Sequence, residues 1–196
     1  MRTVVLAGGR SQRMGFDKLA ALFAGEPLAR RVARGLLELE PLFVTTSAIA
    51  ALVSDLRGVS VIVTEPTAGP SETLALAHAA IPTDAHLAVV PCDLPFIDAG
   101  KVRGFVVRVP DDADLAWPVV GTTPGHPVVW SPKARARIPG LRAAEPPLTL
   151  RADPALHAVA LAESDDAYVT DVDTPSAWAA ASERAARVRR ATRAPR

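Results

Sequence analysis

The stretch Val4 to Lys18 reads VVLAGGRSQRMGFDK and decides how the N-terminal part of the chain folds. Its apolar, β-branched start is typical of a buried strand. Gly8 and Gly9 follow at once, and glycine lets a backbone turn sharply and approach a ligand closely. Arg13 and Lys18 then supply two positive charges. A buried strand, a bare backbone turn and cations can together hold phosphate groups, although an ordinary glycine-rich loop with solvated charges has the same composition.

The glycine spacing of this loop excludes two well-known nucleotide motifs. It matches neither G-x-G-x-x-G nor G-x-x-x-x-G-K-[ST]. The loop therefore does not indicate a dehydrogenase-type dinucleotide fold or a P-loop ATPase. A phosphate-binding turn of another kind and an ordinary loop stay open as alternatives.

Length and composition indicate a single globular domain that needs no disulfide. The chain has 196 residues, 49% of them apolar, and its 22 basic residues nearly balance 21 acidic ones. With its charges balanced, the chain has no overall positive field that would attract nucleic acid. Cys92 is the single cysteine, so no intramolecular disulfide can form. Because no apolar run reaches the roughly 18 residues of a membrane span and no signal peptide is recognisable, we expect a soluble, cytoplasmic protein without a membrane partner.

Hydrophobic spacing along the chain predicts alternating strands and helices. The expected strands are 4–6, 42–46, 59–64, 86–90, 115–120, 126–130, 156–161 and 168–172. The expected helices follow Pro27, Ser47, the 67–73 turn, Asp98, Ser131 and Thr174, with Ser47 and either Ser71 or Thr73 as caps. This alternation is typical of βαβ units. It predicts an α/β fold, a Rossmann-like three-layer sandwich with a mostly parallel sheet, formed by residues 1–182. The arginine-rich segment 183–196 is expected to be a flexible basic tail.

Parallel strands with right-handed crossovers carry their ligand-binding loops on one edge of the sheet. The Gly8 loop, the Gly69 turn and Asp93 each follow an expected strand, so we expect all three at that edge. A carboxylate there suits Mg²⁺, although Asp93 could equally be a turn residue that bonds its own backbone. Asp171 and Asp173 would share one face of a strand and could form a carboxylate pair, or Asp173 could cap the last helix.

Several segments resemble one family, among them Gly69 to Ser71, which is similar to its third motif. The segment from Leu6 to Lys18 is similar to the L-A-G-G-x-S-x-R-M-G-x-D-K signature of the molybdenum-cofactor nucleotidyltransferases. These guanylyl- and cytidylyltransferases join a nucleoside monophosphate to molybdopterin and belong to the wider nucleotide-diphospho-sugar transferase-like class. The segment from Cys92 to Phe96 resembles their D-x-P-[FL] motif, and the segment from Asp171 to Pro175 resembles their D-V-D-T-P or N-V-N-T-P motif.

The resemblance implies a role for particular residues. The implied nucleotide-binding residues are Leu6, Ala7, Gly8, Gly9, Arg13, Lys18, Gly69, Pro70 and Ser71. The implied catalytic residues are Arg13, Lys18 and Asp93, and the implied Mg²⁺ ligands are Asp93 and Asp173, with Asp171 as their neighbour. The segment 125–128 resembles the cytidylyl branch, where it lies near the pterin, so His126 is the implied acceptor-binding residue.

These resemblances predict an enzyme, a Mg²⁺-dependent nucleotidyltransferase that moves a nucleoside monophosphate from an NTP to molybdopterin and releases pyrophosphate. The N-terminal motif favours GTP, whereas GHPVVWS followed by DVDTP favours CTP. We favour GTP, because the resemblance implies that the base lies nearer the N-terminal motif. A relative that acts on another phosphorylated acceptor is an alternative. So is a non-catalytic accessory protein that binds nucleotide together with a molybdoenzyme or its chaperone. Nucleic acid is not an expected partner, because only the basic tail supports it.

Overall fold

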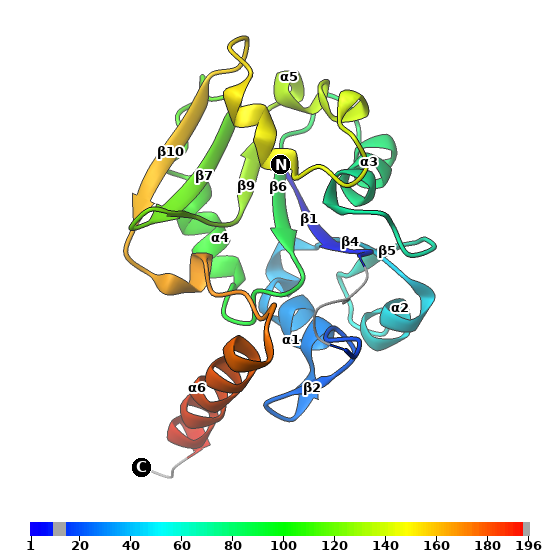
Figure 1. Ribbon diagram of the computed structural model, residues 1–196, viewed down its shortest axis with the longest axis vertical. Coiled ribbons are helices and arrows are strands. Elements are labelled where there is room, and N and C mark those ends of the chain that lie inside the picture. Colours follow the sequence, from blue (N-terminus) through cyan, green and yellow to red (C-terminus); the bar gives the residue numbers. More distant parts are fainter. Residues whose placement is uncertain (10–14, 194–196) are drawn as a thin grey trace.

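The computed structural model describes residues 1–9 and 15–193, and Arg13 lies outside these ranges. An eight-stranded sheet runs through the described residues in the order β10-β7-β9-β6-β1-β4-β5, with β8 paired to β7 (Figure 1). The strands are β1 (Arg2–Ala7), β4 (Leu42–Thr45), β5 (Ser60–Val63), β6 (Leu87–Pro91), β7 (Leu115–Val120), β8 (Thr123–Pro124), β9 (Val128–Trp130) and β10 (Ala158–Glu163). A separate hairpin pairs β2 (Leu22–Phe23) with β3 (Glu26–Pro27).

Strand β1 lies at the centre of the parallel half of the sheet. It pairs in parallel with β4 on one side and with β6 on the other, and β5 extends this half beyond β4. Strand β9 runs antiparallel between β6 and β7, while β10 is parallel to β7. The predicted mostly parallel sheet is therefore confirmed, and the loops after β1, β5 and β6 share one edge.

Helices cover both faces of the sheet and give three layers. The helices are α1 (Leu28–Gly35), α2 (Ser47–Val53), α3 (Pro70–Ala80), α4 (Ala99–Val106), α5 (Pro132–Arg135) and α6 (Pro175–Arg193). Short 3-10 helices are η1 (Leu37–Leu39), η2 (Ile138–Gly140), η3 (Pro147–Ala152) and η4 (Asp166–Tyr168). Val5 packs with α1, α2 and α4 in one buried cluster, and Val4 packs with α3 and α5 in the other. Alternate residues of one strand thus fill two cores, as the two-residue period requires.

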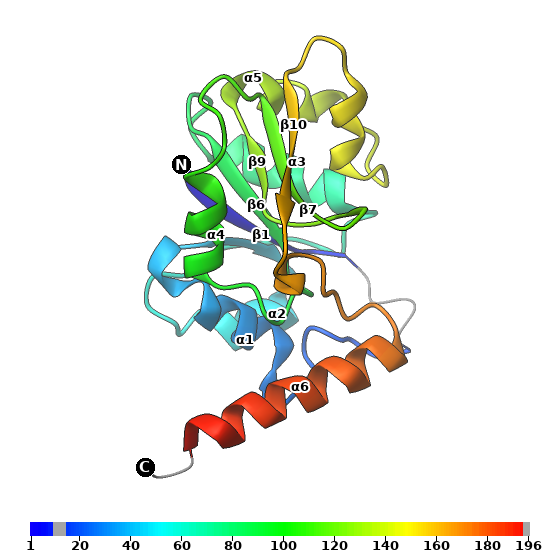
Figure 2. The same cartoon turned by 90° about the vertical axis from the view of Figure 1, so that its left-hand side faces the viewer.

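Helix α6 continues through the expected domain boundary at residue 183. It runs beside the segment that contains the β2–β3 hairpin (Figure 2). Arg184 pairs with Asp166 through both guanidinium nitrogens, and Arg189 donates to the carbonyl of Ala24. The segment up to Arg189 therefore contacts the body of the protein, and its flexibility stays a prediction. Within residues 1–9 and 15–193, no helix combines the length and apolar character that a bilayer crossing requires.

Three local predictions are wrong. Residues 168–172 do not form a strand, because η4 ends at Tyr168 and an irregular segment leads on to α6. Ser47 is the first residue of α2 instead of its cap. Helix α3 begins at Pro70 behind Gly69, so neither Ser71 nor Thr73 caps it. Proline is favoured at a first helical position because its missing N–H has no partner there anyway.

Candidate functional site

A cleft of about 1130 Å³ opens at the carboxyl edge of the sheet. Its lining comes from β1, β6 and β9, the turn before α3 and the start of that helix, the start of η3, and the segment that leads into α6. The lining residues are Leu6, Gly8, Gly9, Lys18, Pro66, Thr67, Ala68, Gly69, Pro70, Glu72, Thr73, Val89, Pro91, Asp93, Pro124, His126, Val128, Trp130, Pro146, Pro147, Leu148 and Asp173. Most of the residues predicted from sequence therefore meet in one place.

Lys18 lies between two carboxylates in this cleft. Its Nζ is 2.8 Å from Oδ2 of Asp93, and it also donates to Oδ1 of Asp173. Burial lowers the pKa of Lys18, but both carboxylates raise it and together outweigh burial, so the ammonium is held charged. Two carboxylates and the Lys18 ammonium therefore converge at this point of the cleft. The arrangement can attract a cation, and it places a lysine beside that cation.

The turn after β1 leaves little room for a side chain at Gly8, because two threonine hydroxyls lie against it. The amide of Thr67 donates to the carbonyl of Gly8 over 2.9 Å, and the hydroxyls of Thr67 and Thr73 are 2.7 Å apart. A Cβ added to Gly8 would lie 3.1 Å from the Thr73 oxygen and 3.2 Å from the Thr67 oxygen. Sequence reasoning missed both threonines as lining residues. The position of Thr67, soon after an expected strand at this edge, was the available signal.

Gly69 has a packing role, which the sequence did not indicate. A Cβ there would lie 2.7 Å from Cα of Ala144 and 2.8 Å from the carbonyl oxygen of Ala143. The hydroxyl of Ser71 is buried and donates to the carbonyl of Glu145. Ser71 is thus directed at the 143–145 segment and is absent from the described lining of the cleft. Gly69 and Pro70 both line the cleft, whereas Ser71 supports its wall from behind.

Strand β9 supplies the far end of the cleft. Val128 and Trp130 lie at alternate positions of the strand and share the face that lines the cleft, and His126, which precedes the strand, lines the cleft as well. Nδ1 of His126 and Nε1 of Trp130 are buried and have no hydrogen-bond partner among the described residues. Burial lowers the pKa of His126, and Asp93 and the carbonyl of Val89 oppose this shift only in part, so the imidazole is held neutral. Buried polar atoms normally find partners, so a ligand at this end could satisfy them.

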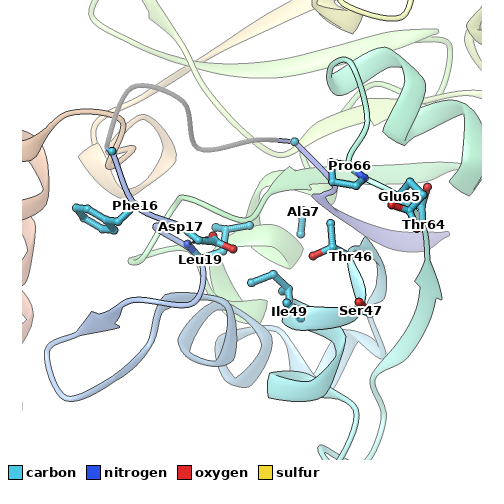
Figure 3. A pocket seen from close by; sticks show the side chains of 13 residues that line it. Ala7, Phe16, Asp17, Leu19, Thr46, Ser47, Ile49, Thr64, Glu65 and Pro66 are labelled. Carbon is cyan, nitrogen blue, oxygen red and sulfur yellow. Dashed lines mark hydrogen bonds between the residues drawn. The ribbon is translucent and has the colours of Figure 1, made fainter.

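A second pocket of about 630 Å³ adjoins the cleft through Gly9 and Pro66, which line both. Phe16, Asp17 and Leu19 lie along one side of it, and Thr64, Glu65 and Pro66 lie along the other (Figure 3). Ala7, predicted to contact nucleotide, lines this pocket. Thr46, Ser47 and Glu65 are lining residues that sequence reasoning missed, because nothing in their local pattern separates them from ordinary loop residues.

Two further predicted residues are not among the described residues that line the cleft. Asp171 is exposed and is absent from the described cleft lining. Burial raises the pKa of Asp171, and the negative charges of Asp173 and Asp93 raise it further. Arg13 lies outside the described residues, so its role rests on sequence alone. Within residues 1–9 and 15–193, no group of three or more His, Cys, Asp or Glu side chains could hold a metal ion.

Comparison with known proteins identifies the family. The family model of the MobA-like NTP transferase domain matches residues 3–155, and the chain therefore belongs to that family. The molybdenum cofactor guanylyltransferase of Rhizobium leguminosarum bv. trifolii is 33% identical over 120 residues, which are 58% of this chain and 54% of that protein. The chain thus spans about half the length of the curated relatives it matches.

Solved structures support the same fold. Rv0371c from Mycobacterium tuberculosis is 22% identical with a TM-score of 0.78, covering 93% of this chain and 96% of that one. A second structure of Rv0371c is a complex with manganese, with 18% identity and a TM-score of 0.75 over 93% of this chain and 97% of that one. Molybdopterin-guanine dinucleotide biosynthesis protein A from Archaeoglobus fulgidus is 18% identical with a TM-score of 0.71, covering 95% and 100%. The nucleotide-diphospho-sugar transferase-like fold predicted from sequence is confirmed.

Proposed function

We propose that this protein is a divalent-metal-dependent nucleotidyltransferase that transfers GMP from GTP to the phosphate of molybdopterin and releases pyrophosphate. The convergence of Asp93 and Asp173 on Lys18 in the cleft carries the proposal, because such a group can hold a cation and phosphates together. Family membership and the guanylyltransferase relatives support the reaction class and the choice of GTP over CTP.

Asp93 and Asp173 fit a Mg²⁺ site. Mg²⁺ is usually held by one or two carboxylates together with waters and substrate phosphates, and these two side chains offer hard oxygen ligands at one point. The manganese complex of Rv0371c supports a divalent metal in this fold. When bound, the metal would neutralise phosphate charge as the new bond forms. Asp171 is the weaker candidate, because it lies outside the described lining of the cleft.

The chain's own residues would position the triphosphate. In the reaction, an oxygen of the acceptor phosphate attacks the α-phosphorus, and the bond from that phosphorus to the pyrophosphate oxygen breaks. Such chemistry depends on positioning and charge neutralisation more than on a covalent nucleophile. The turn at Gly8 and Gly9 would offer backbone N–H groups to the phosphates, and the charged ammonium of Lys18 would contact them directly. Arg13 would add charge as pyrophosphate leaves.

The far end of the cleft would receive the acceptor. It combines apolar surface from Val128 and Leu148 with two unpartnered polar atoms, Nδ1 of His126 and Nε1 of Trp130. A flat heterocycle with polar edges, such as a pterin, can use both kinds of surface. His126 is thus a proposed acceptor contact, now joined by Trp130.

Two measurements test the proposal. Thermal shift with GTP, CTP, ATP and UTP in the presence of Mg²⁺ should show GTP raising the melting temperature most, because a ligand of the native state stabilises it. Pyrophosphate release should then require GTP, Mg²⁺ and molybdopterin together. Tight GTP binding without pyrophosphate release would favour the accessory-protein alternative. Turnover with CTP alone would move the protein to the cytidylyl branch.

A further inference from the structure

The C-terminal helix holds the segment that carries Lys18 through an aromatic cluster. Trp178 on α6 meets Phe16 edge to face, with ring centroids 5.7 Å apart and an interplanar angle of 86°. It meets Phe23 in the same way at 5.3 Å and 87°. In this geometry the positive edge of one ring points to the negative face of the other. Phe23 is fully buried, whereas Phe16 is 45% exposed, so Trp178 joins the core to a surface segment.

This aromatic cluster stands next to both partners of the ion pair in the cleft. Phe16 precedes Lys18 by two residues, and Trp178 follows Asp173 by five. The link from Asp173 to Trp178 is a capped first turn, because Thr174 Oγ1 accepts from the Ala177 amide and the Trp178 amide donates to the Thr174 carbonyl. One contact between two rings therefore constrains Lys18 and Asp173 relative to each other.

The segment that carries Lys18 is also held by hydrogen bonds of its own. The backbone amide of Leu19 donates to the carboxylate of Asp17, and the amide of Ala21 donates to the Asp17 carbonyl, each over 3.1 Å. Leu19 is buried in the core cluster that also contains Phe23. Lys18 therefore sits between a core anchor at Leu19, in a cluster that also includes Ala181 and Ala185 of α6, and the aromatic anchor at Phe16, whose ring contacts Trp178.

We propose that Trp178 is a positioning residue, which sets Lys18 against Asp173 by clamping Phe16. The inference rests on the proposed function and adds to it a helix that lies beyond the region matched by the family model, which ends at residue 155. Trp178 does not line the cleft in the described part of the chain, so it acts through Lys18 and Asp173. Without the clamp, the flexible four-carbon stem of Lys18 would have to be ordered by each incoming triphosphate.

The remaining contacts of α6 provide a matched control. The guanidinium of Arg184 lies 4.2 Å from the ring centroid of Phe96 and pairs with Asp166 at 2.8 and 2.9 Å. These contacts dock the helix two turns beyond Trp178, on residues outside the 15–18 segment. Arg184→Met should therefore loosen α6 while leaving the aromatic contact to Phe16 in place.

Steady-state kinetics of the full-length protein test the clamp. Trp178→Ala should raise KM for GTP roughly tenfold and leave KM for molybdopterin unchanged. A tenfold change corresponds to the free energy of one to two aromatic pairs. Trp178→Phe, which can keep an edge-to-face contact, should restore KM for GTP to within about twofold. Phe16→Ala should reproduce the effect, and the double variant should be no worse than either single one. Arg184→Met should lower the melting temperature with KM for GTP unchanged.

Hydrogen exchange in the absence of nucleotide tests the clamp independently of turnover. The amides of Leu19 and Ala21 should exchange faster in Trp178→Ala than in the wild type, and at the wild-type rate in Arg184→Met. If Trp178→Ala matches Arg184→Met in both KM and exchange, the tryptophan only docks the helix and the inference is wrong. A wild type that turns over no NTP would defeat the proposed function, and the exchange result would still decide whether Trp178 holds the Lys18 segment.

Discussion

Replacing Lys18 with methionine should make the protein's stability depend on divalent metal. Methionine keeps an unbranched stem of similar length but removes the ammonium that lies between Asp93 and Asp173. The two carboxylates then face each other without that charge. A divalent cation should bind the variant more tightly than the wild type, because it no longer competes with the lysine. The triphosphate should bind the variant more weakly, because it loses a direct cationic contact.

The structure sets the size of the effect. At 2.8 Å and an effective dielectric constant of about 20, the attraction between Lys18 and Asp93 is about 6 kcal/mol before desolvation is counted. Removing one partner of a fully buried pair costs about 3–5 kcal/mol. The side chains of Lys18 and Asp93 are 12% and 20% exposed and that of Asp173 is 38% exposed, so water screens part of this. A loss of about 2 kcal/mol is expected, which corresponds to about 4–8 °C in melting temperature for a domain of this size.

The assay is thermal unfolding with EDTA and across a Mg²⁺ titration. In EDTA, Lys18→Met should have a lower melting temperature than the wild type. Adding Mg²⁺ should remove most of that difference in melting temperature. Lys101→Met is the matched control, because Lys101 also bridges two aspartates, Asp98 at 3.4 Å and Asp165 at 3.2 Å, outside the cleft. The melting temperature of Lys101→Met should stay close to that of the wild type and should not respond to Mg²⁺. Equal Mg²⁺ shifts in the wild type and Lys18→Met would refute the reasoning.

Three further predictions follow from the same contacts. Asp93→Ala should lower kcat at least about 100-fold without changing the far-UV circular dichroism, and near-normal turnover would remove Asp93 from the metal site. Trp130→Phe removes the indole N–H but keeps an aromatic ring, so KM for the acceptor should rise about tenfold while KM for GTP holds; a shift in both would contradict the acceptor role. Burial raises the pKa of Asp114, but hydrogen bonds from Lys133, the His157 amide and Ser131 outweigh it and lower the pKa overall. The resulting stability is present above the ordinary carboxyl pKa of about 4 and is lost as the pH falls through the folded pKa, so Asp114→Asn should be less stable than the wild type in urea unfolding at pH 7 and close to it at pH 3.

Much of the site was predictable because parallel strands collect their carboxyl ends at one edge. The strand before Gly8 and the strand before Asp93 are neighbours in the sheet, so both loops had to meet there. Asp173 lines the cleft, although the strand that was predicted to carry it does not form, and its role as a metal ligand stays a prediction. Residues 168–172 are irregular, and two-residue alternation does not place Asp171 beside Asp173 in the cleft. Ser71 was predicted to contact nucleotide, but its hydroxyl instead donates a hydrogen bond to the carbonyl of Glu145.

Local sequence is enough to predict most of the strands, the glycine turn after β1 and the order of the loops along the edge. These features depend on the period of apolar residues and on turn chemistry, both of which act over a few neighbouring positions. The tertiary structure alone decided that Lys18 reaches Asp93, 75 positions away, and Asp173, 155 positions away. It also decided that Trp178 clamps Phe16. The contacts to Asp173 and Phe16 depend on how α6 and the residues before it pack against the N-terminal segment, and the contact to Asp93 depends on the pairing of β1 with β6. No local pattern specifies any of these partners.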